Sequence, residues 1–325
     1  MGRIAVGVDL GATNVRVALG EENGTIIRRL KESTIKDRGA MGISEQIIRM
    51  IRSLQPGKEW VSNLQGIGIG SAGPLDIKSG GLVNPANINF PFVPLVEPLR
   101  ETFGLNTYLL NDGLSAVMGE KFFGLGKNHE NLGYITISSG IGGGIFVDNH
   151  LLLGKDGNAT EIGHLTIDFE GRLICGCGRR GHWEAYCSGT GIPNYAKLLL
   201  NEFLKENSDI KSSLLETVNG NYDNITSKMI FNAAKAGDKF SMEVVTKIGI
   251  LNAIGFASVL DAYDPSLITV GGSLALKNEK LVLEPIRQEI NKHAINRVPE
   301  ICITKLGDEV VLYGALALAF HPLED

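Results

Sequence analysis

Cysteine and tryptophan are scarce in this chain, and it has no long run of basic residues. Its 325 residues include only four cysteines and two tryptophans. In a reducing compartment such a sparse set of cysteines is typical of metal ligands or buried thiols, not of a disulfide framework. The 31 basic and 36 acidic residues are mixed along the chain and give a net charge of -5. No extended cationic surface is expected, so nucleic acid is not a predicted partner.

Segments for secretion or membrane insertion are also missing. The N-terminus MGRIAVGVDLG has neither the apolar core nor the small-residue cleavage site of a signal peptide. No apolar run approaches the ~20 residues that a membrane helix needs. We therefore expect a cytoplasmic protein with no membrane partner. With 43% hydrophobic and 21% charged residues, the chain can form the cores of two domains without crosslinks.

The order of the expected elements indicates an α/β protein made of two related halves. Residues 4–19 are predicted to form a strand, a glycine turn and a second strand, and residues 134–154 repeat this pattern with the turns in register. We place the boundary near residue 115. A smaller α/β domain would span residues 1–115, a larger one would span residues 116–304, and a final helical segment, 305–325, would pack back onto the first.

Three glycine turns are candidates for binding a nucleotide. The turn DLGATN offers Asp9, Gly11 and Thr13 to an anion, although a plain hairpin turn is the better explanation of this motif taken alone. Four glycines in five positions, including Gly142 and Gly143, exceed what a hairpin needs and favour close approach of the backbone to a polyphosphate. The pair Gly271 and Gly272 follows a predicted strand, where another part of a nucleotide can rest.

Two common nucleotide motifs are not supported. Each Gly-Lys pair, at Lys58, Lys127 and Lys155, lacks the following Ser or Thr of a P-loop. The stretch GIGSAG, residues 68–73, matches the dinucleotide fingerprint, but Pro74 follows and no helix is predicted to open there. We interpret that match as chance.

The pair Asn111 and Asp112 ends a predicted buried strand and precedes a predicted helix. A carboxylate at this point can accept the proton of a hydroxyl that attacks phosphorus. Asn and Asp are also among the best helix N-caps. The local sequence leaves both interpretations open.

A cluster of metal-ligand residue types lies between residues 161 and 184. His164, Cys175, Cys177 and His182 would supply two thiolates and two imidazoles, a set that suits a closed, structural Zn²⁺ site. Glu161 and Glu184 would remain free to accept hydrogen bonds from sugar hydroxyls.

Taken together, these motifs resemble the ROK family of sugar kinases and sugar-responsive repressors. The resemblance runs from DLGATN through SAGP, LLNDG, SSGIGGGI, EIGH and CGCGRRGHWE to TVGGSLA. It implies a two-domain, actin-like fold of the duplicated ribonuclease H type, with an interdomain cleft. It also implies an ATP-dependent hexose kinase that uses Mg²⁺ and carries a structural Zn²⁺.

The resemblance also implies roles for individual residues. Asp112 would be the catalytic base for the sugar 6-hydroxyl, and the glycine turns would hold ATP. Sugar-binding residues would be Asn87, Asn111, Glu161, His164 and Glu184; nucleotide-binding residues would be Asp9, Gly11, Thr13, Gly142, Gly143, Gly271 and Gly272; zinc ligands would be His164, Cys175, Cys177 and His182.

Two departures from the family pattern concern the metal and the sugar. His182 stands where the family usually has a cysteine, which keeps coordination feasible but changes its charge. The stretch PANINFPF contains an extra Ala86 and lacks the tryptophan that is common in glucose-specific members. The candidate substrates are therefore glucose and an N-acylhexosamine such as N-acetylmannosamine.

Two alternatives from other functional classes are considered. A non-catalytic repressor would carry a helix-turn-helix before the first glycine turn, but only eight residues precede Asp9. A sugar-independent actin-like ATPase would lack the EIGH and CGCGRRGHWE motifs. The kinase is the preferred interpretation, and the resemblance implies a homodimer.

Overall fold

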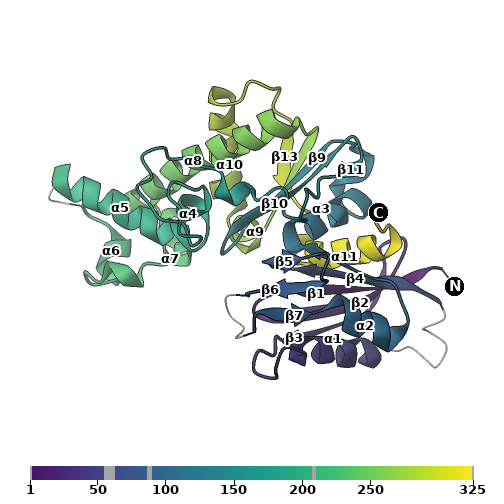
Figure 1. The fold of residues 1–325 in the computed structure, drawn as a ribbon. Helices are drawn as coiled ribbons and strands as arrows, with labels where there is room; N and C mark the ends of the chain where they lie inside the picture. The colour runs from purple at the N-terminus through teal and green to yellow at the C-terminus, as the bar shows by residue number, and fades with distance from the viewer. Residues whose placement is uncertain (1, 55–62, 86–89, 207–209, 324–325) are drawn as a thin grey trace. The chain divides into compact units, whose positions relative to one another are not determined.

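The structure is a computed structural model that describes residues 2–54, 63–85, 90–206 and 210–323 (Figure 1). Contacts between Cα atoms divide the chain into two compact units. The first contains residues 1–134, 144–160 and 304–325, and the second contains residues 135–143 and 161–303. The candidate sugar ligand Asn87 lies outside the described residues.

The first unit is built on a five-stranded sheet with the order β3-β2-β1-β4-β8. Strand β1 pairs antiparallel with β2 and parallel with β4, which pairs parallel with β8. The buried side chains of these strands form one hydrophobic core with helix α1. The strands span β1 (Ile4–Leu10), β2 (Asn14–Glu21), β3 (Ile26–Ser33), β4 (Leu64–Ser71) and β8 (Thr107–Asn111). The predicted strand, turn and strand at residues 4–19 are therefore confirmed.

Helices and a small second sheet complete this unit. Strand β4 leads into a three-stranded sheet, so the expectation that no helix opens after GIGSAG is confirmed. The small sheet consists of β5 (Leu75–Asp76), β6 (Gly81–Val83) and β7 (Phe92–Pro94). The helices are α1 (Gly42–Ser53), α2 (Val96–Phe103), α3 (Asp112–Phe122), the 3-10 helices η2 (Leu125–Asn128) and η6 (Gly307–Glu309), and α11 (Val310–Phe320).

Helix α11 packs against β1, β4 and α3. This close packing depends on glycine, because a Cβ atom at Gly68 would lie 1.9 Å from the carbonyl oxygen of Ala315 and one at Gly314 would lie 1.6 Å from that of Ser115. Helix α11 is almost entirely apolar and buried, as expected for a helix inside a core. It places residues 304–325 in the first unit, although they end the chain.

The second five-stranded sheet has the order β11-β10-β9-β12-β13. The hairpin of β9 and β10 begins the predicted repeat of the opening pattern. The strands are β9 (Leu132–Ile137), β10 (Ile141–Val147), β11 (His150–Leu151), β12 (Leu267–Gly271) and β13 (Glu300–Ile303).

The remaining helices belong to the second unit. They are η3 (Ile162–His164), α4 (Glu184–Cys187), α5 (Gly191–Glu206), α6 (Ser213–Thr217), η4 (Tyr222–Asn224), α7 (Ser227–Lys235), α8 (Lys239–Tyr263), α9 (Ser273–Lys277), α10 (Glu279–Glu289) and η5 (Ile290–Lys292).

Helix α8 is long and apolar enough to cross a membrane by length and composition, a property that the sequence analysis did not anticipate. Its most apolar window is 61% buried inside the protein. It packs against α4, α5, α7 and α10. These contacts are typical of the core helix of a folded domain.

The first unit extends further along the chain than the proposed boundary near residue 115. Helix α3 packs against α11 and β4, and this packing groups residues 116–134 with the first unit. Residues 144–160 and the last residues of the chain join it as well.

Candidate active site and metal centre

The first glycine turn connects β1 to β2 and is braced by β3. The Gly11 amide donates to the Asn14 carbonyl oxygen at 2.9 Å, and the Thr34 hydroxyl donates to the Gly11 carbonyl oxygen at 2.8 Å. The Thr13 side chain is exposed. The turn is thus a well-ordered hairpin connection that leaves a hydroxyl accessible.

Asp9 lies near the carboxyl end of β1, directly across the ladder from Arg16 of β2. The Arg16 guanidinium donates to Asp9 Oδ2 at 3.1 Å and to Asp308 Oδ2 at 2.9 Å. Burial raises the pKa of Asp9 to about 6, and the neighbouring Asp112 adds to this rise, while Arg16 opposes it. Asp9 is therefore a partly buried carboxylate whose charged form Arg16 favours and desolvation disfavours.

Asn111 and Asp112 stand where β8 ends and α3 begins. The Asn111 side-chain oxygen accepts from the Leu114 amide at 2.7 Å, so Asn111 is the helix N-cap. This cap does not use the Asn111 side-chain nitrogen. The exposed Asp112 accepts from the Gly113 amide at 2.9 Å. The capping interpretation is confirmed for Asn111, and the adjacent carboxylate of Asp112 is left at the surface of the helix N-terminus.

The second glycine turn differs from its predicted form. The connection between β9 and β10 is Ser138, Ser139 and Gly140, whereas Gly142, Gly143 and Gly144 lie within strand β10. A Cβ atom at Gly144 would lie 2.4 Å from the carbonyl oxygen of Gly113. Part of this glycine run is therefore explained by the close packing of α3.

The third glycine pair lies beside the second turn. Gly272 has a φ of 89°, and a Cβ atom there would lie 2.5 Å from the carbonyl oxygen of Ile137. The hydroxyls of Ser138 and Ser273 are 3.1 Å apart. Two of the predicted nucleotide-binding turns, far apart in the sequence, thus meet within the second unit.

A pocket of about 570 Å³ opens at this meeting point. Its volume lies within the range of small-molecule sites. Besides the turn residues, α7 and α9 supply an apolar wall and polar side chains. The lining consists of Ser138, Ser139, Gly189, Thr190, Ser227, Lys228, Phe231, Asn232, Lys235, Ser273, Leu274, Lys277 and Asn278.

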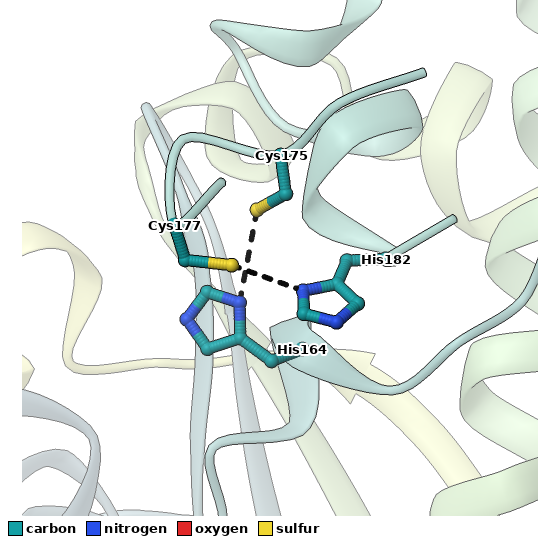
Figure 2. A group of neighbouring side chains, drawn as sticks. All are labelled: His164, Cys175, Cys177 and His182. Atoms are coloured by element: carbon teal, nitrogen blue, oxygen red, sulfur yellow. Dashed lines mark hydrogen bonds between the residues drawn. The ribbon is translucent and has the colours of Figure 1, made fainter. Parts of the chain in front are cut away.

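The four predicted metal ligands converge on one point, as Figure 2 shows. One ligand atom from each of the four side chains lies within 4.8 Å of all the others. Cys175 Sγ is 3.7 Å from His164 Nδ1, and Cys177 Sγ is 3.3 Å from His182 Nδ1. His164 ends the short helix η3, and the other three follow on the loop that leads to α4.

This arrangement fits a tetrahedral zinc ion. Bond lengths of about 2.0–2.3 Å place neighbouring ligand atoms roughly 3.3–3.8 Å apart, as observed for both pairs. Burial lowers the pKa of His182, which favours the neutral imidazole that a metal requires. Burial also raises the pKa of the Cys175 thiol to about 11, so metal binding would displace its proton. Because four protein ligands are available, the site suits a structural ion.

Two predicted sugar ligands, Glu161 and Glu184, lie beside this centre, and a third, His164, belongs to it. Glu161 Oε2 lies 3.8 Å from His164 Nε2, on the side of the ring opposite the metal cluster. Glu184 Oε1 lies 3.7 Å from Cys175 Sγ, while its Oε2 accepts from the Ile141 amide at 2.9 Å. Glu184 thereby connects the metal centre to the first residue of β10.

The structure also places functional candidates that the sequence did not reveal. Arg16 was missed, although its position opposite Asp9 across a short turn was a usable signal. The α7 residues Ser227, Phe231 and Asn232 were missed because they follow the ordinary spacing of an amphipathic helix, which gives no local sign of a pocket.

A family model described as "ROK family" matches residues 5–321. The chain belongs to the ROK family. The predicted membership of the ROK family and the predicted two-domain actin-like α/β fold are confirmed by this match and by the family's solved structures.

Relatives within the ROK family include both enzymes and regulators. The chain is 36% identical to a glucokinase from Pyrobaculum calidifontis over 98% of this chain and 96% of the relative. A ROK family glucokinase from Streptomyces griseus, solved with glucose and AMPPNP, has a TM-score of 0.76 at 32% identity, with 98% and 99% coverage. A xylose repressor from Caldicellulosiruptor bescii is 27% identical over 98% of this chain and 78% of its own length.

Proposed function

We propose that this protein is an ATP-dependent kinase that phosphorylates the 6-hydroxyl of a hexose. The main support is the combination of an exposed carboxylate at a helix N-terminus with a cluster of carboxylates and imidazole around the metal centre. The likeness to glucokinases at 32–36% identity over nearly the whole chain supports the same activity.

Asp112 is proposed as the general base. Its carboxylate is held at the start of α3 by the Gly113 amide and is exposed, so a substrate hydroxyl can reach it. It would accept the proton of the 6-hydroxyl while the hydroxyl oxygen attacks the γ-phosphorus of ATP. The helix cap uses only the side-chain oxygen of Asn111. Its side-chain nitrogen would donate a hydrogen bond to the sugar.

Glu161, His164 and Glu184 are proposed to bind sugar hydroxyls. The Glu161 carboxylate accepts from hydroxyl donors, and His164 can contact the metal through Nδ1 and a sugar through Nε2. Asn87, outside the described residues, completes the proposed set. A zinc ion held by the two cysteines and two histidines would fix the orientation of His164 but take no part in phosphoryl transfer.

The nucleotide is proposed to occupy the 570 Å³ pocket of the second unit, with its nucleoside near Gly271, Gly272 and α7. The turn with Asp9, Gly11 and Thr13, together with Gly142 and Gly143 at the start of strand β10, would contact the phosphates. Magnesium that arrives with the nucleotide needs few protein ligands, because it keeps most of its water, and it would neutralise charge on the phosphates.

The sugar is proposed to be glucose or an N-acylhexosamine such as N-acetylmannosamine. The glucokinase relatives favour glucose, whereas the altered stretch PANINFPF favours an acylated sugar. We further propose that the enzyme acts in the cytoplasm as a homodimer.

The decisive experiment measures ADP release with Mg·ATP against a panel of sugars that includes glucose, mannose, N-acetylglucosamine and N-acetylmannosamine. Sugar-dependent ADP release, with the 6-phosphate identified by NMR, is expected for at least one sugar. Sugar-independent hydrolysis would instead favour an ATPase. Sugar binding without any turnover would favour a non-catalytic, repressor-type protein; a xylose repressor is among the relatives.

A further inference from the structure

The loop that carries three of the four candidate metal ligands has little hydrophobic support. Residues 166–182 contain only two isolated β-bridges, Thr166 with His182 and Ile174 with Arg180. Phe169 is 100% exposed and Ile174 is 59% exposed. Because these apolar side chains face solvent, their burial cannot fix the shape of the loop.

Asp168 joins the two sides of this loop, through its carboxylate on one side and its backbone amide on the other. Asp168 is 8% exposed and accepts from both the backbone amide and Nε of Arg172, each at 3.1 Å. Its own amide donates to the carbonyl oxygen of Gly181 at 3.1 Å, and its carbonyl oxygen accepts from the Gly171 amide at 3.0 Å. Asp168 thus contacts the loop near its beginning and immediately before His182.

Tyr186 connects the same carboxylate to the body of the second unit. It lies on α4, has no exposed surface, and donates a short hydrogen bond from its hydroxyl to Asp168 Oδ2. The hydroxyl also accepts from the Leu173 amide at 2.9 Å, two residues before Cys175. Its ring meets that of Tyr195 edge to face, with centroids 5.4 Å apart.

We propose that Asp168 and Tyr186 are positioning residues of the metal centre. Neither residue belongs to the four-residue ligand cluster. Their side chains hold the backbone before Cys175, at Arg172 and Leu173, and the Asp168 backbone amide holds it after Cys177, at Gly181. They hold the loop in its ligand-binding shape before the metal arrives, so the ion enters a preformed site. The inference rests on the proposed metal centre and is independent of the proposed kinase activity.

Zinc affinity of the full-length protein tests this inference. The metal-free protein is titrated with Zn²⁺ in competition with a chromophoric chelator, and the visible spectrum of the Co²⁺ form reports the ligand geometry. Tyr186→Phe removes only the hydroxyl and is expected to weaken zinc binding about tenfold or more, as is typical when a partner that orients metal ligands is lost. Asp168→Asn is expected to act in the same direction.

The matched control is Tyr195→Phe, which removes the hydroxyl of the neighbouring buried tyrosine and keeps both rings. It should bind zinc as the wild type does. Thermal unfolding of each metal-free variant separates a general loss of stability from a specific loss of affinity. If Tyr186→Phe does not fold, Asp168→Asn provides the measurement.

Wild-type zinc affinity in both Tyr186→Phe and Asp168→Asn would overturn the inference. So would an equal weakening in Tyr195→Phe, since the effect would then follow from general packing. A wild-type protein that takes up neither Zn²⁺ nor Co²⁺ would overturn the metal centre and this inference with it. None of these results depends on whether a sugar is phosphorylated.

Discussion

The hairpins β1–β2 and β9–β10 share one backbone plan but carry different chemistry. In the first, the strands hold a partly buried acid and a base across from each other, Asp9 and Arg16. In the second, the turn carries hydroxyls, and the amide of Ile141 donates to Glu184 at 2.9 Å. The two hairpins share the same backbone arrangement. The side chains at each turn differ, and they would determine which groups of a ligand each turn can bind.

The comparison is sharpened most by substituting one carboxylate in each unit. Asp112→Asn should lower kcat about 100-fold or more, because general base catalysis contributes that much to turnover. Glu184→Gln should mainly raise the KM for the sugar, by roughly tenfold, as expected for a weakened hydrogen bond to a charged group. Steady-state kinetics check both, with Glu101→Gln on the exposed end of α2 as the control. Equal losses of kcat in the two variants would contradict the division of roles.

Substitution of two glycines near the second hairpin, Gly272 and Gly142, tests which of them serves packing and which serves ligand binding. Gly272→Ala should destabilise the protein by about 1–3 kcal/mol, because of its positive φ and the contact with Ile137. Gly142→Ala should fold normally, since the nearest atom to its Cβ, in Thr136, would be 3.5 Å away. Urea unfolding measures stability, and the KM for ATP measures binding. A severe loss of stability in Gly142→Ala would show that this glycine serves the fold.

Asp9 in the first hairpin makes the stability of the fold depend on pH. The pKa of Asp9 is about 6, above the ordinary 3.8, so the folded state binds more protons between about pH 4 and 6. This group therefore stabilises the fold at low pH, and its contribution is lost as pH rises through 6. If activity needs the carboxylate, activity declines below about pH 6.

Arg16→Gln removes the charge that opposes this rise in pKa. The acidic limb of the pH-rate profile should move upward by roughly one pH unit. A profile of kcat/KM from pH 5 to 9 checks this, with Arg28→Gln on the neighbouring β3 as the control. An unchanged acidic limb would exclude Asp9 as the titrating group.

The smallest effect on turnover is expected for a substitution at residue 182 of the candidate metal centre. His182→Cys restores the residue that the family usually has, so the variant should keep about one zinc per chain and near-normal turnover. Its Co²⁺ form should show stronger thiolate-to-metal absorption, because a third thiolate is present. His182→Ala should lose affinity. Unchanged Co²⁺ spectra in both variants would show that residue 182 does not ligate the metal.

Much of the fold could be predicted from local patterns in the sequence. Alternating β-branched residues and the glycine turn predicted β1 and β2, and the polar residues after a buried strand predicted the start of α3 at Asp112. A final helical segment within residues 305–325 that packs back onto the first domain was predicted, and α11 is observed at Val310–Phe320, but its individual contacts were not predictable. Gly68 and Gly314 permit its close packing, and only contacts distant in the sequence reveal this.

The candidate site was predictable to a different degree in its two parts. Metal ligands were predictable because cysteine and histidine are chemically distinctive and lie within 19 residues of one another, from His164 to His182. The network of Asp168 and Tyr186 was not predictable, because acids and tyrosines occur at many positions without pairing. The pocket beside α7 was also missed, since its lining comes from four separate segments.

The sequence by itself determined the α/β pattern, the duplicated hairpin, the family and the four candidate metal ligands that the structure brings together. These depend on residue types and spacings that act within one or two elements. Only the tertiary structure decided that Arg16 faces Asp9, that Gly144 serves packing, and that Glu184 connects the metal centre to β10. Most of these contacts join residues far apart in the chain, and buried polar groups form them because an unpaired polar group would lose its hydrogen bonds to water.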